Sequence, residues 1–143
     1  MATGFQVVFD CAEPEKVGRF WAEALGYVEQ PPPDGFATWD EFLERMSVPR
    51  ERWDDGYAVV DPDGVHPRLF FQRVPEPKTV KNRVHLDINI ASRQMPIEER
   101  RAKVDAEVER LQSTGATRLY EMEEDGGYFV TMADPEGNEF CVH

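Results

Sequence analysis

Two short segments of the sequence carry side chains that could bind a ligand or a metal ion. His85 and Asp87 are two residues apart in an alternating segment, so both should lie on one face of a strand, opposite Leu86. At the end of the chain, Glu139, Cys141 and His143 share a face by the same rule. Imidazole and carboxylate groups are common ligands of divalent metals. The thiol of Cys141 has no neighbour in sequence that would lower its pKa, which favours an inert buried cysteine over a nucleophile.

Polar residues occupy matching positions in the first half of the chain. Gln6 and Asp10 alternate with an apolar set in the expected strand 5–11, and Arg68 and Gln72 share a face in the strand 68–72. We expect the apolar faces to meet helices and the polar faces to line one concave surface. The residues expected to bind a ligand there are Gln6, Asp10, Arg68, Gln72, His85, Asp87 and Cys141.

The elements that position these residues occur twice. The segment 56–64, with Gly-Tyr at its start and Asp-Pro-Asp-Gly at its end, is echoed by 127–137. Each copy follows an alternating strand and a helix that ends near a glycine, Gly26 or Gly115, and each continues into one more strand. The pattern predicts an α+β domain, 1–143, built from two βαβββ modules. Their expected bounds are about 4–73 and 83–143, with a linker at 74–82. Such a module cannot bury both faces of its sheet alone, so we expect a cavity between the two.

An insertion of about residues 31–55 distinguishes the first module. Thr38 and Glu41 form a capping-box pattern that predicts a helix with Trp39 and Phe42 on one side. Two interpretations stay open. The helix could bury its apolar stripe against the outer surface of the sheet, or it could act as a lid, with Trp39 stacking on a ligand.

Composition excludes several classes of partner. The net charge of −12 and the absence of a basic patch argue against nucleic acid binding. No apolar run approaches the roughly 20 residues that span a bilayer. Two cysteines are too few for a secreted disulfide framework, so we expect a cytoplasmic protein. A small molecule is the expected partner, and a homodimer stays open as the assembly.

Two segments resemble the vicinal oxygen chelate superfamily, specifically its glyoxalase-like and bleomycin-resistance-like proteins. Residues 20–27 are similar to the family helix that ends in Leu-Gly-aromatic, and residues 134–140 are similar to its closing hairpin. The resemblance covers the whole chain. It implies paired βαβββ modules that form a half-open, eight-stranded, barrel-like sheet around a pocket.

The resemblance also implies where a metal would bind. In metal-dependent members the ligands lie on the first and last strands of each module, which here correspond to Gln6, His85, Cys141, and Phe70 or Gln72. The carboxylate usual on the last strand is missing from both modules, so His85 and Gln6 are the metal candidates. Asp10, Asp87 and Glu139 could supply carboxylates, but at positions that the family does not use. We therefore expect no complete metal site and no cofactor, with a divalent metal as the lesser alternative.

The expected function is small-molecule binding in the cavity between the modules, and the sequence leaves open whether the protein is an enzyme. The alternative is a metal-dependent lyase, isomerase or ring-cleaving dioxygenase. Fold resemblance alone cannot choose between them, because one fold hosts many chemistries.

Overall fold

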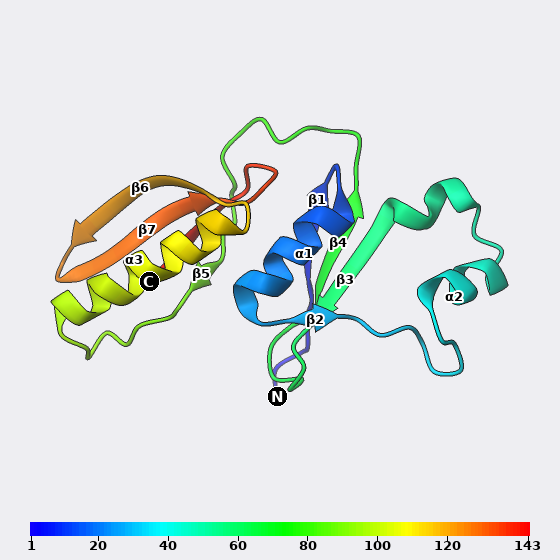
Figure 1. Ribbon diagram of the computed structural model, residues 1–143, viewed down its shortest axis with the longest axis horizontal. Helices are drawn as coiled ribbons and strands as arrows, with labels where there is room; N and C mark the ends of the chain where they lie inside the picture. The colour runs from blue at the N-terminus through cyan, green and yellow to red at the C-terminus, as the bar shows by residue number, and fades with distance from the viewer. The chain divides into compact units, whose positions relative to one another are not determined.

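The computed structural model describes residues 1–143 and divides into two compact units, residues 1–77 and 78–143. Each unit contains a four-stranded sheet whose elements follow the order strand, helix and three strands (Figure 1). The prediction of an α+β fold with paired βαβββ modules is therefore confirmed. The eight strands form two sheets of four, and neither sheet closes on itself. No helix combines the length and the apolar character needed to cross a membrane.

The first unit is built around helix α1. Its strand order is β1-β4-β3-β2, with β1 parallel to β4 and the other neighbours antiparallel. The elements are β1 (Val7–Cys11), α1 (Pro14–Leu25), β2 (Val28–Glu29), α2 (Trp39–Arg45), the 3₁₀ helix η1 (Arg50–Asp55), β3 (Gly56–Val60) and β4 (Leu69–Arg73).

Sequence signals explain both ends of α1. Pro14 occupies the first turn, where its missing N–H is not needed, and Gly26 ends the helix with a left-handed φ of 70°. The apolar stripe between them faces the sheet. Trp21 is 1% exposed, and its ring centroid lies 5.1 Å from that of Phe9, which in turn stacks on Phe71. Phe20 and Trp21 are therefore packing residues of the first unit.

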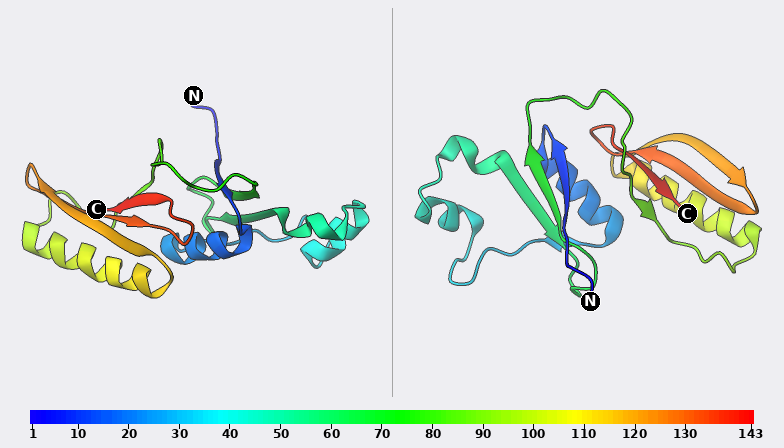
Figure 2. Two further views of the ribbon diagram at one scale, coloured as in Figure 1. Left: turned by 90° about the horizontal axis from the view of Figure 1, so that it is seen from above. Right: turned by 180° about the vertical axis from the view of Figure 1, so that it is seen from behind.

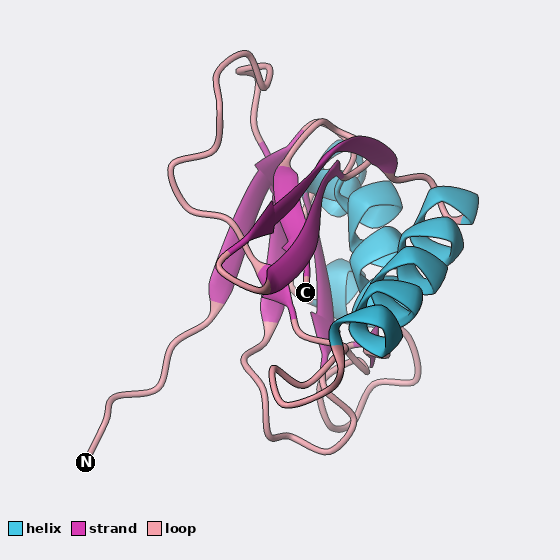
Figure 3. Ribbon diagram, turned by 90° about the vertical axis from the view of Figure 1, so that its left-hand side faces the viewer, coloured by secondary structure: helices cyan, strands magenta, loops and turns pink.

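The second unit repeats this plan with a longer helix. Its strand order is β5-β8-β7-β6, and β5 is parallel to β8. Helix α3 packs on one side of this sheet (Figure 3) and buries Val104, Val108 and Leu111 against it. The elements are β5 (Asp87–Ile88), α3 (Ile97–Ser113), β6 (Thr117–Glu124), β7 (Gly127–Ala133) and β8 (Glu139–Val142).

Both Asp-Pro-x-Gly segments form hairpin tips, as predicted. The Gly64 N–H donates to the Asp61 carbonyl at 3.0 Å, and the Gly137 N–H donates to the Asp134 carbonyl at 2.9 Å. These bonds from the fourth residue to the first are those of β-turns that join β3 to β4 and β7 to β8. The repeated turn thus fixes the last hairpin of each unit.

Strand β6 lies at one edge of the second sheet and has a strand neighbour on one side only. All eight of its residues are exposed. Its partner β7 is mostly buried, and a register irregularity between Arg118 and Tyr120 interrupts their pairing. The edge is therefore long and accessible to solvent.

The first strand of each unit is shorter than predicted. Strand β1 begins at Val7, and Phe5, expected on the apolar face, is 74% exposed. Strand β5 covers Asp87–Ile88 alone, and Val84, expected to face the core, is 80% exposed. Alternation in the sequence therefore predicted correctly which face each paired residue occupies. It predicted wrongly where strand pairing begins.

The insertion forms the predicted capped helix. It does not bury its apolar stripe against the outer surface of the sheet, as one of the two interpretations required. The Glu41 N–H donates to the Thr38 hydroxyl at 3.1 Å, and a Glu41 carboxylate oxygen accepts from the Ala37 N–H. No residue of α2 is buried, so its apolar side is not covered by a sheet (Figure 2). Its aromatic rings contact each other instead, with Trp39 and Phe42 centroids 5.7 Å apart. The lid interpretation stays a prediction.

Candidate functional site

The open face of the second sheet carries a hollow of about 270 Å³. Strand register explains which side chains line it. Asp87 on β5 pairs with Cys141 on β8, Cys141 pairs with Thr131 on β7, and Thr131 pairs with Tyr120 on β6. This row therefore crosses all four strands on one face, because directly opposed residues point to the same side. The lining residues are Lys81, His85, Asp87, Tyr120, Phe129, Thr131, Glu139, Cys141 and His143.

Asp87 lies between two histidines in this hollow. Its Oδ1 is 3.2 Å from the His85 Nε2 and 3.5 Å from the His143 Nε2. The side chain of His143 is further held by its ring, which stacks on Phe129 at a centroid distance of 4.9 Å and an interplanar angle of 20°. The carboxylate thus orients two imidazoles toward one point, although all three side chains keep contact with solvent.

Cys141 forms the floor beside these groups. It is 7% exposed, and its Sγ lies 3.4 Å from the Thr131 hydroxyl oxygen. Burial, with a contribution from the negative charge of Asp87, raises the pKa of the Cys141 thiol. The free side chain is therefore a neutral thiol near pH 7, which agrees with the expectation that it is not an activated nucleophile.

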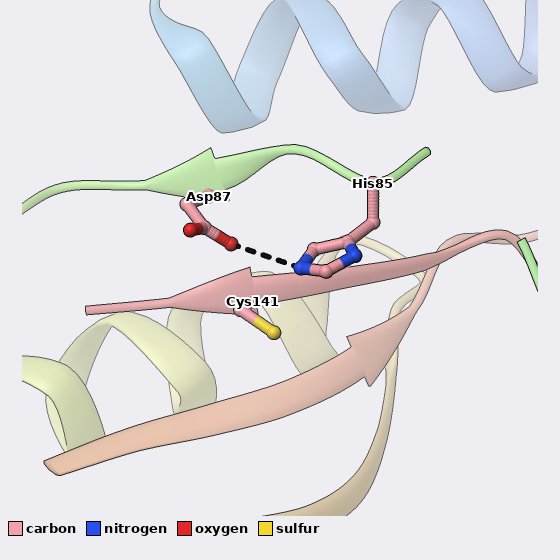
Figure 4. Close-up of side chains that lie close together, drawn as sticks. All are labelled: His85, Asp87 and Cys141. Carbon is pink, nitrogen blue, oxygen red and sulfur yellow. Dashed lines mark ion pairs between the residues drawn. The ribbon is translucent and has the colours of Figure 1, made fainter. Parts of the chain in front are cut away.

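His85, Asp87 and Cys141 together offer three different metal-ligand atoms. These atoms all lie within 4.8 Å of one another (Figure 4). Two of the three residues come from β5 and the segment before it, and the third comes from the adjacent strand β8. The parallel pairing of β5 with β8 is what brings them together.

Glu139 ties the start of the second unit to β8. Its carboxylate lies 3.1 Å from the Lys78 ammonium and accepts from the Asn82 N–H at 3.0 Å. Burial opposes ionisation of this group, but these hydrogen bonds and the Lys78 charge outweigh it and lower the pKa of Glu139. Its carboxylate therefore binds the segment that leads to His85.

The remaining predicted residues lie in the first unit. Arg68 donates from Nη1 to the Gln6 side chain at 2.6 Å and from Nε to the Gln30 side chain at 2.8 Å, and burial lowers its pKa. The indole N–H of Trp39 donates to the Gln30 carbonyl at 2.7 Å. Gln30 therefore connects Arg68 with Trp39, a link that the sequence did not reveal.

Asp10 and Gln72 are exposed neighbours in the register of β1 and β4. The eight predicted residues thus divide into a first-unit set and a second-unit set. His85, Asp87 and Cys141 form the second set and meet in one hollow. Their roles in binding stay predictions, as do those of Gln6, Asp10, Arg68, Gln72 and Trp39.

Four lining residues were missed by the sequence analysis: Lys81, Tyr120, Phe129 and Thr131. A signal for two of them existed, because Phe129 and Thr131 alternate with buried Val130 and so share the open face. Tyr120 had no such signal, since the irregularity next to it in β6 breaks the alternation.

The strand registers and the burial pattern together show which residue of the first unit corresponds to Cys141. Val8 pairs with Phe70 and Asp10 with Gln72, so the parallel register alone would allow either residue. On β8, Cys141 lies between the fully buried Phe140 and Val142, and on β4, Phe70 lies between the buried Leu69 and Phe71, whereas Gln72 is followed by the exposed Arg73. Phe70, rather than Gln72, therefore occupies the position at which the family resemblance implies a metal ligand. A phenyl ring cannot coordinate a metal ion, so these positions do not reproduce an oxygen-rich metal site.

Comparisons with known proteins agree with this architecture. A family model described as a glyoxalase-like domain matches residues 6–143. None of the curated proteins matches the sequence of the chain.

Solved structures match over nearly the full length at low identity. Fosfomycin resistance protein FosX from Mesorhizobium loti has a TM-score of 0.63 at 16% identity, with 100% of this chain and 92% of that chain covered. A glyoxalase/bleomycin resistance protein/dioxygenase family enzyme from Burkholderia phytofirmans has a TM-score of 0.61 at 15% identity, with 96% and 94% covered. A mutant FosX from Listeria monocytogenes, complexed with Mn(II) and 1S,2S-dihydroxypropylphosphonic acid, gives 0.61 at 13% identity, with 100% and 90% covered.

At these identities the structural matches establish the fold alone. The family model covers almost the entire sequence, including both modules and both hairpins. This chain therefore belongs to the glyoxalase-like domain family.

Proposed function

We propose that the protein binds a small organic molecule in the hollow on the open face of the second sheet. The observation that carries the proposal is the composition of this hollow. It combines two aromatic rings, Tyr120 and Phe129, with the convergent polar groups of His85 and Asp87. Binding sites for small molecules typically pair apolar surface with a few such oriented polar groups.

The arrangement favours a ligand with a planar apolar part and one hydrogen-bonding end. Phe129 already stacks with His143, so its ring can offer a face or an edge to a planar group. Asp87 accepts and the imidazoles of His85 and His143 can donate or accept, which would fix the polar end. Binding alone does not require an activated nucleophile, which agrees with the raised pKa of the Cys141 thiol.

A thermal-shift screen with a fragment library of planar carboxylates, phenols and amides tests this function. A ligand present at 100 times its Kd should stabilise the chain by about 2.7 kcal/mol. We expect Phe129→Ala to abolish the shift produced by the best fragment, and the exposed-site variant Val65→Ala to preserve it. If no fragment gives a shift that depends on Phe129, the proposal is wrong.

A metal-dependent lyase, isomerase or dioxygenase is the second candidate. It is favoured by the grouping of His85, Asp87 and Cys141 and by the Mn(II) ion in the Listeria FosX complex. It is opposed by Phe70 at one of the family positions. Turnover that is lost after chelation and restored by a divalent metal would place this candidate first.

A further inference from the structure

We propose that His85, Asp87 and Cys141 form a binding site for a thiophilic divalent cation, zinc, built entirely within residues 78–143. This inference goes beyond the proposed function, because an organic ligand could bind the open face with or without an ion. It differs from the family pattern in using Asp87, a position that the resemblance does not assign to a metal, and a thiolate in place of a carboxylate.

The distances agree with a tetrahedral ion. Zinc–nitrogen and zinc–oxygen bonds of about 2.0–2.2 Å imply a separation of roughly 3.3 Å between two tetrahedral ligand atoms. The His85 Nε2 and the Asp87 Oδ1 are 3.2 Å apart. A zinc–sulfur bond of about 2.3 Å implies roughly 3.6 Å from sulfur to the other ligands. The three ligand atoms lie within 4.8 Å of one another, so no pair has to approach by more than about 1.2 Å to reach the tetrahedral separation.

The ligand types determine which ion fits. Zinc binding would release the proton of the neutral Cys141 thiol to solvent and leave a thiolate on the ion. A thiolate and an imidazole suit zinc and other thiophilic ions, whereas magnesium, calcium and manganese prefer oxygen ligands. Replacement of the family carboxylate by Cys141 therefore changes the expected ion rather than removing the site. No complete site was predicted from the sequence because Asp87 lies at a position that the family does not use for a metal ligand.

The surroundings support three ligands and one open position. His143 lies 3.5 Å from Asp87 and is stacked on Phe129, so it would hold the Asp87 carboxylate in its binding orientation. Thr131, 3.4 Å from the Cys141 sulfur, would do the same for the thiolate. The fourth position would face the hollow, where water or a ligand atom could occupy it.

Cobalt(II) is the probe that tests sulfur coordination directly. The untagged full-length chain, dialysed against a chelator, is titrated with cobalt(II) and then with zinc. We expect one equivalent to bind, a near-ultraviolet sulfur-to-cobalt charge-transfer band to appear, and zinc to displace cobalt stoichiometrically. A preference for zinc over manganese would not be diagnostic, since most nitrogen and sulfur sites show it.

The sequence supplies matched controls, because it has two cysteines and three histidines. Cys141→Ser should abolish the charge-transfer band, whereas Cys11→Ala, at a buried cysteine of the first unit, should retain it. His85→Ala should weaken zinc binding more than the roughly 10- to 100-fold expected for loss of an outer-shell partner. His66→Ala, at an exposed histidine in the β3–β4 hairpin, should leave it unchanged.

Other results would overturn the inference. Cobalt that binds without a sulfur band, a band that survives in Cys141→Ser, or no binding at all would each reject the site. Circular dichroism of every variant separates loss of ligands from loss of folding. Because no organic ligand is present, failure here leaves the fragment-binding result unaffected, and a negative fragment screen leaves the cobalt result unaffected.

Discussion

The open faces of the two units differ in chemistry although their strands pair in the same way. In the first unit, the pair Val8 and Phe70 occupies the place that Asp87 and Cys141 occupy in the second. The first face thus presents apolar groups with an arginine held by amides, whereas the second presents ionisable groups and a thiol. The shared fold thus determines where on each sheet a site can form. The few residues that differ at these positions determine which unit has the side chains for one.

The sides of the two sheets that face the helices differ much less. We expect substitutions in these two cores to have the largest effects on stability. Phe71 and Phe140 are each 0% exposed on the last strand of their unit. We expect Phe71→Ala and Phe140→Ala each to lower the free energy of unfolding by about 3–5 kcal/mol. Urea denaturation followed by circular dichroism measures both losses. A loss below about 1 kcal/mol for either variant would show that its unit does not depend on the buried ring.

A buried arginine distinguishes the second unit from the first. Arg100 on α3 is 9% exposed and donates to three backbone carbonyls, those of Arg93, Met95 and Gly126. We expect Arg100→Met to cost about 2–3 kcal/mol, because three backbone carbonyls lose a charged donor. The neighbouring Arg101 pairs with Glu123 at the surface, so Arg101→Met should cost about 1 kcal/mol or less. Equal losses in thermal unfolding would contradict this difference.

Close packing of α1 on β3 is a feature that we can test in the first unit. A Cβ at Gly18 would lie 2.2 Å from the Tyr57 Cδ1 and 3.1 Å from the Phe71 Cδ2. Alanine normally stabilises a helix interior by about 1 kcal/mol relative to glycine. Here we expect Gly18→Ala to destabilise by about 1–2 kcal/mol, because the ring of Tyr57 must move. A rise in Tm would show that the ring moves at little cost.

Tyr57 and Tyr128 follow the repeated glycines, and their substitution should change the stability least. Burial and the charge of Glu29 raise the pKa of Tyr57 to about 12, and burial and a hydrogen bond to Asp105 raise that of Tyr128 to about 12. A raised phenol pKa contributes stability below the unfolded value of about 10, and this stability is lost as pH rises from 10 to 12. Tyr128→Phe should therefore reduce stability by about 1 kcal/mol at pH 7 and flatten the alkaline decline.

Tyr57→Phe serves as the counterpart in the first unit. Tyr128 is 3% exposed and donates to the Asp105 carboxylate at 2.5 Å, whereas Tyr57 is only half-buried. We expect a smaller loss for Tyr57→Phe in chemical denaturation at pH 7 and pH 10.5. A larger loss for Tyr57→Phe than for Tyr128→Phe would mean that burial and the hydrogen bond to Asp105 do not make Tyr128 the more stabilising of the two.

The repeated segments were predictable because each uses local rules that packing does not overrule. Pro14, Gly26 and the two Asp-Pro-x-Gly turns fix their own backbone geometry, and strand alternation correctly placed Asp87 and Cys141 on one face. Burial of Arg100 was not predictable, because its partners are carbonyls of irregular segments, at Arg93 and Met95 before α3 and at Gly126 between β6 and β7. The approach of Asp87 to both histidines depends on side-chain rotamers, which alternation does not specify.

Strand β6 has a consequence for how this protein behaves at high concentration. A long exposed edge strand is a template on which another chain can add a strand, and fibrils grow in this way. Leu119, Tyr120 and Met122 would favour such growth. The same strand carries Arg118 and three glutamates, at 121, 123 and 124, so identical edges that approach each other would bring like charges together. These surface charges would therefore oppose the addition of a second strand at this edge.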